Sequence, residues 1–171
     1  MEKQVVAENV DQSRIVLATD LVKKYMWWTM GAGLIPVPLV DVLTISGVQL
    51  KMLKEISDIY EIKFNDNKGK SIIAALLGSV VPNSLAFGGL GSLLKIIPLI
   101  GPLVGGVSMS LFSGAATYAI GKVFIQHFET GGTFLDFNTV SVKDYFQAKF
   151  EEGKDIANEM NEKKDKKEET V

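Results

Sequence analysis

The sequence contains no cysteine, a single histidine and, among its basic residues, a single arginine, Arg14. Without cysteine the chain can form neither a disulfide nor a thiolate that attacks a substrate or binds a metal. The histidine, His127, has no histidine or cysteine nearby, so a metal site or a catalytic triad lacks its partners. Without a basic stripe or an arginine cluster, nucleic acid is not an expected partner.

One segment is similar to a nucleotide-binding motif. Gly69-Lys70-Ser71 ends like a phosphate-binding P-loop, but that pattern needs a further glycine where Phe64 stands, and no predicted strand precedes it. We interpret the segment as a loop that leads into a helix. Since no pair of carboxylates has a spacing suited to acid–base catalysis either, the sequence predicts a protein that is not an enzyme. It predicts no catalytic, cofactor-binding or metal-binding residue.

Charge is nearly absent from the centre of the chain. Between Ser71 and Gly121 the only charged side chain is Lys95, which separates two uncharged arms, Ser71–Leu94 and Ile96–Gly121. As a helix, each arm would reach roughly 35 Å, enough to cross a hydrocarbon core of about 30 Å. The preferred interpretation is a membrane hairpin with Lys95 at its tip. Most flanking lysines lie outside the hairpin, so both termini are expected on the cytoplasmic side of a bacterial inner membrane.

Proline and glycine interrupt this region. Pro82-Asn83 divides the first arm, and Pro98 and Gly101 follow Lys95. Small residues such as Gly101 allow two helix backbones to approach closely. The alternative interpretation is a cytoplasmic, oligomeric helical protein, with the apolar hairpin as its buried core. The serines and threonines of the arms would suit such an interior.

Amphipathic helices are predicted on both sides of the hairpin. Apolar residues recur at helical spacing from Asp11 to about Met30 and from Pro38 to about Tyr60. A third amphipathic helix lies within residues 138–161. The fold class is therefore all-α, with five or six helices and a central Gly/Pro-rich hydrophobic hairpin at about 71–121. Residues 1–10 are expected to be flexible, and the charged tail, residues 162–171, to be disordered.

Shorter signals mark where helices begin and end. The polar stretch Lys63–Lys70 is predicted to be a loop. Gly131-Gly132 is typical of a helix C-terminus, and Ser141 with Asp144 resembles a capping box that opens the last helix.

The paired tryptophans, Trp27 and Trp28, are candidate interaction residues. They follow Lys23 and Lys24 at the start of an uncharged stretch. Tryptophan beside lysine is typical of a membrane anchor at headgroup level, whereas two core tryptophans beneath a helix end are the equally weighted alternative.

The second predicted helix supplies four further candidates. Pro36 and Pro38 end the preceding helix, and Pro38 suits the first turn of the next one. Asp41 lies near that helix N-terminus, where the helix dipole favours an acid. Gln49 falls near the apolar face and needs a hydrogen-bond partner if it is buried.

Several landmarks occur together in a fixed order. They are Ile35-Pro36-Val37-Pro38 with Asp41; Gln49, Met52 and Tyr60; Leu94-Lys95-Ile96-Ile97-Pro98 with Gly101; and Thr117-Tyr118-Ala119-Ile120-Gly121-Lys122 before His127-Phe128. Over roughly Ala18 to Phe137 the chain resembles the domain of unknown function found in YcjF-type inner-membrane proteins, which is also attached to Era-like GTPases.

The resemblance implies a non-enzymatic, membrane-associated helical module, here over residues 11–137. Its expected partners are the lipid bilayer and a separate GTPase, since this chain contains no GTPase domain; homo-oligomers belong to the alternative interpretation. The candidate structural and interaction residues are Trp27, Trp28, Pro36, Pro38, Asp41, Gln49, Lys95, Pro98, Gly101, Gly121 and Lys122.

Overall fold

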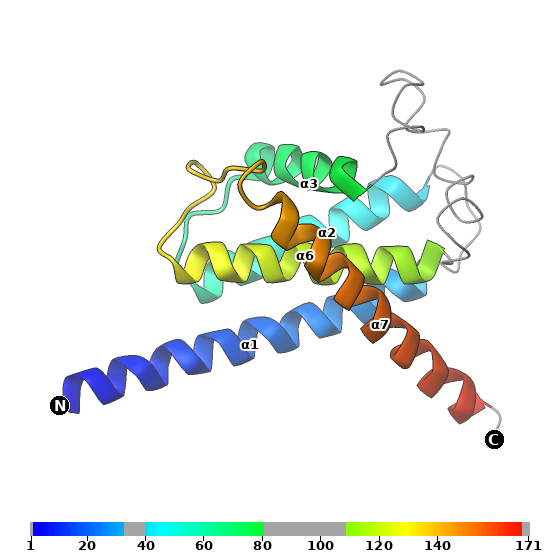
Figure 1. Ribbon diagram of the computed structural model, residues 1–171, viewed down its shortest axis with the longest axis horizontal. Helices are drawn as coiled ribbons and strands as arrows, with labels where there is room; N and C mark the ends of the chain where they lie inside the picture. Colours follow the sequence, from blue (N-terminus) through cyan, green and yellow to red (C-terminus); the bar gives the residue numbers. More distant parts are fainter. Residues whose placement is uncertain (1, 33–39, 81–108, 169–171) are drawn as a thin grey trace.

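The computed structural model describes residues 2–32, 40–80 and 109–168, with side chains described in 11–31, 47–80 and 110–163. Every regular element in these ranges is an α-helix (Figure 1). The helices are α1 (Glu2–Ala32), α2 (Val40–Ile59), α3 (Asp66–Val80), α6 (Met109–Glu129) and α7 (Lys143–Glu168). The predicted all-α fold class is confirmed.

Helix α6 is the centre of the bundle. It packs against each of the other four described helices, with α7 crossing it obliquely (Figure 1). Its residues are buried almost without interruption from Ser113 to Gly121, and Phe124 is fully enclosed. A helical segment that is buried on all sides has to be surrounded by other helices, and α1, α2, α3 and α7 all pack against α6. The lack of charge in residues 109–121 of this helix therefore follows from their central position.

Glycines allow the neighbouring helices to lie close to α6. A Cβ atom at Gly121 would lie 2.3 Å from Cγ2 of Val22 in α1, and one at Gly114 would lie 2.8 Å from Cγ of Met30. On the other side, a Cβ atom at Gly153 of α7 would lie 2.9 Å from the carbonyl oxygen of Ala115. Real Cβ atoms do not approach other atoms so closely, so these contacts require the absence of a side chain.

The predicted hairpin is corrected in its second arm. Residues 110–121, which form its C-terminal half, lie inside the bundle instead of in a lipid-facing span. For these residues the buried-core interpretation holds. Pro82-Asn83 and the predicted tip with Lys95 lie outside the described residues. Within the described parts of the chain, no helix combines the length and apolarity needed to cross a membrane.

Three helix boundaries differ from the predictions. Helix α1 begins at Glu2, although the apolar periodicity begins only near Asp11, and α7 continues to Glu168 through residues predicted to be disordered. The stretch Lys63–Lys70, predicted to be a loop, contains the start of α3. There the side chain of Asn65 accepts a hydrogen bond from the backbone N–H of Lys68 at 3.0 Å, which is the geometry of an N-cap.

The end of α6 is as predicted. Gly131 has φ of 81°, and the N–H groups of Gly131 and Gly132 donate to the carbonyls of Phe128 and His127 at 2.9 and 3.0 Å. This pair of hydrogen bonds is a Schellman motif, which needs a residue that tolerates positive φ. The following loop returns to the bundle through Phe134, whose ring is buried among other aromatic rings.

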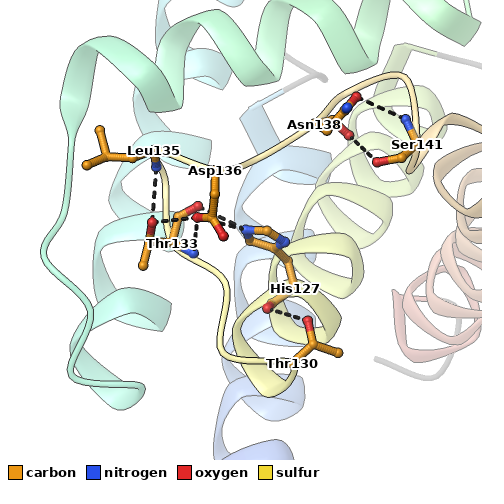
Figure 2. Close-up of polar contacts among 7 residues, drawn as sticks. All are labelled: His127, Thr130, Thr133, Leu135, Asp136, Asn138 and Ser141. Atoms are coloured by element: carbon orange, nitrogen blue, oxygen red, sulfur yellow. Dashed lines mark hydrogen bonds and ion pairs between the residues drawn. The ribbon is translucent and has the colours of Figure 1, made fainter.

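The predicted capping box at the start of α7 is wrong. The hydroxyl of Ser141 donates to the carbonyl of Asn138 at 3.0 Å, and the N–H group of Ser141 donates to Asn138 Oδ1 (Figure 2). Asn138 Oδ1 also accepts from the N–H group of Val140. Asn138 therefore organises this turn, and α7 begins at Lys143.

Candidate functional site

The outer face of α1 carries exposed apolar side chains. Val16 and Leu17 are 58% and 60% exposed, and Trp27 and Trp28 are 44% and 62% exposed. Their spacing places all four on one side of the helix, together with the exposed Lys23 and Lys24. We call Val16, Leu17, Lys23, Lys24, Trp27 and Trp28 the outer face. Of the two equally weighted interpretations, the one that places both tryptophans in the core is wrong.

The opposite side of α1 packs against the bundle, and this packing fixes the direction in which the outer face points. Ala18, Val22 and Met26 are fully buried, and Val22 meets Gly121 of α6. Tyr25 donates a hydrogen bond to Glu55 of α2 at 2.7 Å. Burial, followed by this hydrogen bond, raises the pKa of Tyr25, so the phenol remains a donor at neutral pH. The outer face is consequently a fixed surface of the bundle.

A cluster of charged groups lies where α6 meets α7. The hydroxyl of Tyr118 donates to Oε1 of Glu152, and Nζ of Lys149 pairs with Oε2 of the same carboxylate at 2.5 Å. These two contacts, led by the one from Lys149, hold the pKa of Glu152 below its usual value. Lys122 is half-buried beside them. Burial, and then repulsion from Lys149, lowers the pKa of Lys122.

A buried polar seam joins α1, α2 and α6. Gln49 of α2 is fully buried, and its Nε2 donates to Oγ1 of Thr117 at 3.5 Å. The hydroxyl of Thr117 donates to Oγ1 of Thr29 at 3.1 Å, and Ser110 donates to the carbonyl of Met30 at 2.8 Å. Two buried atoms of the seam, Gln49 Oε1 and Ser113 Oγ, have no partner among the described residues. The seam sets the register of three helices.

His127 has a structural role in the loop after α6. Its Nε2 lies 2.9 Å from the carbonyl oxygen of Thr133 and 3.8 Å from Oδ1 of Asp136 (Figure 2). Asp136 in turn accepts from the N–H group and the hydroxyl of Thr133 at 2.6 and 2.5 Å. These bonds, the hydroxyl one first, lower the pKa of Asp136. Gly132 lies directly beneath the imidazole ring, where a Cβ atom would be only 2.3 Å from Cε1.

The described side chains suggest no catalytic or metal centre. No three histidine, aspartate or glutamate residues among them gather as a metal site requires. A cleft of about 380 Å³ lies between the α2–α3 connection, residues 61–65, and the loop residues Thr133, Phe134 and Leu135. Its lining holds one lysine, Lys63, and one glutamate, Glu61.

The predicted candidates therefore fall into separate groups. Trp27 and Trp28 lie on the outer face, Gln49 in the seam, and Gly121 and Lys122 where α6 meets α1. The remaining candidates lie outside the described side chains. These are Pro36, Pro38, Asp41, Lys95, Pro98 and Gly101.

Sequence reasoning missed two groups of residues. The roles of Thr29 and Thr117 in the seam were not foreseen, although polar residues recurring in an uncharged region were their signal. No local sequence pattern predicts that Lys23, Lys122 and Lys149 lie close together, because these lysines are far apart in sequence.

The described residues form an all-α bundle with a buried central helix and an N-terminal helix whose outer face is exposed and partly apolar. The chain matches the family described as "Domain of unknown function (DUF697)" over residues 2–155, and it belongs to this family. A relative from Magnetospirillum gryphiswaldense, "Magnetosome membrane protein 22", is 34% identical over 152 residues, which cover 89% of this chain and 78% of the relative. No solved structure matches the chain.

Proposed function

We propose that this protein is a non-enzymatic module of the bacterial inner membrane, with both termini in the cytoplasm, and that it docks a cytoplasmic partner. The observation that carries the proposal is the exposure of Trp27 and Trp28 beside Lys23 and Lys24 on the outer face. Tryptophan prefers the membrane–water interface because its ring is amphipathic, and lysine is attracted to anionic headgroups.

Two further observations support a membrane location. Residues 81–108, which lie outside the described ranges, contain Lys95 as their single charged residue. The relative from Magnetospirillum gryphiswaldense is named a membrane protein. The family resemblance supports a separate GTPase as the docked partner.

The two tryptophans are the only ones in the chain, so their fluorescence reports on the outer face alone. We expect the full chain, reconstituted in phosphatidylcholine vesicles, to show tryptophan emission that is quenched by lipids brominated near the headgroup. Trp27→Phe and Trp28→Phe each leave a single probe, and both probes should be quenched. Emission that responds only to a quencher dissolved in water would contradict the proposal.

A matched control uses an exposed apolar residue elsewhere. Leu135 is 74% exposed in the loop after α6. Leu135→Trp in a Trp27→Phe/Trp28→Phe background should escape quenching, since the proposed contact is made by the outer face. Equal quenching at position 135 would mean that any exposed apolar group enters the lipid. Carbonate extraction provides a second test, because full release into the supernatant would contradict integral insertion.

A second candidate function, an oligomeric helical interaction protein in the cytoplasm, is favoured by one observation. The C-terminal half of the second arm is buried inside the bundle, so part of the uncharged region needs no lipid. This candidate predicts a monodisperse oligomer without detergent and tryptophan emission that changes with protein concentration. The quenching experiment separates the two functions.

A further inference from the structure

Three lysines from three helices converge beside the outer face. Val22 contacts Gly121, so the next residues along α1 and α6, Lys23 and Lys122, lie beside this helix contact. On α7, a Cβ atom at Gly153 would lie 3.1 Å from Cβ of Tyr118, one turn before Lys122. Lys149 lies one turn before Gly153 and is close enough to Lys122 to repel it, as is Lys23.

The carboxylate of Glu152, which lies nearby, already has partners for its negative charge. Both oxygens of Glu152 have partners, the hydroxyl of Tyr118 and the ammonium of Lys149. Lys122 forms no ion pair with any side chain that the structure describes, although Glu152 attracts it at longer range. A half-buried ammonium with two other lysines nearby loses hydration and is repelled by them. An anion bound among the three lysines would compensate for the lost hydration of Lys122 and would reduce the repulsion between the ammonium groups.

We propose that Lys23, Lys122 and Lys149 bind the phosphate group of an anionic phospholipid headgroup. This inference rests on the proposed membrane contact of the outer face. Lys23 and Trp27 are one turn apart on α1, so a tryptophan at the membrane interface brings the lysines to the depth of the lipid phosphates. Lys149 donates one of its three N–H groups to Glu152 and keeps two. All three ammonium groups can therefore donate charge-assisted hydrogen bonds to one phosphate, and such bonds are stronger than neutral ones.

The test compares two brominated lipids as quenchers of tryptophan in the reconstituted full chain. At equal mole fraction, brominated phosphatidylglycerol should quench more than brominated phosphatidylcholine, since a lysine near an anionic surface contributes roughly fivefold in affinity. Lys122→Gln should reduce the preference by about fivefold, and Lys122→Arg should retain it. Lys51→Gln, an exposed lysine on α2, is the matched control and should leave the preference unchanged.

A stability measurement separates binding from packing. Lys122→Gln should have an unchanged or raised midpoint of thermal unfolding in phosphatidylcholine vesicles, because it removes a repelled charge. If Lys122→Arg loses the preference together with Lys122→Gln, the lysine acts through packing and the inference is wrong.

The remaining outcomes identify which proposal fails. Equal quenching of the wild type by both brominated lipids would overturn the lipid site alone, whereas no quenching by either would overturn the proposed function. Inorganic phosphate is the last ligand tested in this experiment. If it binds the wild type but not Lys122→Gln, and the wild type shows no preference for phosphatidylglycerol, the site belongs to soluble phosphate and the lipid assignment is wrong.

Discussion

Helix α6 and the outer face of α1 are both rich in apolar side chains, but their surroundings are opposite. The apolar residues of α6 lie inside the bundle, and Phe124 has no exposed surface, whereas Trp28 on α1 is 62% exposed. An uncharged sequence therefore does not distinguish a protein core from a lipid contact. Exposure in the folded chain separates the two, and it points to α1 rather than α6 as the surface that meets a partner.

Stability should respond very differently to substitutions at Phe124 and at Trp28, and the loss at Phe124 should be the largest effect predicted. Phe124→Ala should lower the free energy of unfolding by about 3–5 kcal/mol, because it leaves a cavity among Phe128, Phe134 and Phe137. Trp28→Ala should change it by only about 0.5 kcal/mol or less, since the ring is mostly exposed. Denaturant unfolding in one detergent measures both variants. Equal losses would show that the outer face is packed against protein.

Membrane affinity should depend strongly on Trp28, although this residue contributes little to stability. Trp28→Ala should weaken partition into vesicles by roughly 2 kcal/mol, or about thirtyfold, because about half of a large aromatic surface leaves the lipid. Vesicle flotation of the folded variant gives the partition coefficient. Leu135→Ala serves as the control for an exposed apolar residue away from α1 and should float like the wild type. A normal coefficient for Trp28→Ala would contradict the proposed contact.

The contact between α1 and α6 should be sensitive to a single methyl group. Gly121→Ala is expected to cost about 1–3 kcal/mol of stability, since its Cβ atom would overlap Val22. Val22→Ala removes the overlapping methyl groups, so the double variant should lose less stability than the sum of the two single variants. A thermodynamic cycle from denaturant unfolding measures this coupling. Additive losses would contradict the observed approach of the two helices.

The buried seam allows a finer comparison within α6. Thr117→Val should cost about 1–2 kcal/mol, because it leaves Gln49 without its acceptor. Ser113→Ala should cost little or even stabilise the bundle, since the Ser113 hydroxyl is buried without a partner. Both changes remove one hydroxyl, and their unfolding free energies provide the measurement. A larger loss at position 113 would mean that its hydroxyl has a partner in solution.

The smallest expected effect is a dependence of stability on pH. Since the pKa of Glu152 is lower in the folded chain than in the unfolded one, its contribution is present above its unfolded pKa of about 4.3 and is lost as pH falls through the folded value. Solvent screens this half-exposed carboxylate, so the effect should be slight. Glu152→Gln should flatten the acid limb of a plot of stability against pH. An unchanged acid limb would show that Glu152 is equally easy to protonate in both states.

Local signals predicted the helices themselves well. The apolar periodicity identified α1 and α2, and the two glycines identified the end of α6. Both signals work because hydrophobic spacing and positive φ are local properties. Boundaries were less predictable. The start of α3 depends on the Asn65 cap within a charged stretch, and the turn before α7 uses Asn138 where Ser141 resembled a cap.

The candidate site was predictable only in part. Trp27 and Trp28 were identified from their place beside two lysines, but the sequence left core and interface equally open. Their exposure depends on which side of α1 meets α6. The contact between Val22 and Gly121 shows that the side opposite the tryptophans faces α6. The lysine cluster of α1, α6 and α7 depends on tertiary contacts alone, so no local pattern could reveal it.

The all-α class, the family and the absence of cysteine-based chemistry could all be read from the sequence, because composition and helical periodicity require no knowledge of neighbouring helices. That residues 110–121 lie inside the bundle while Trp27 and Trp28 face outward became clear from the packing of the helices. The hydrophobic effect favours removal from water equally in a protein interior and at a lipid interface, so the sequence alone does not separate the two. The packing of whole helices decides which of the two surrounds each residue.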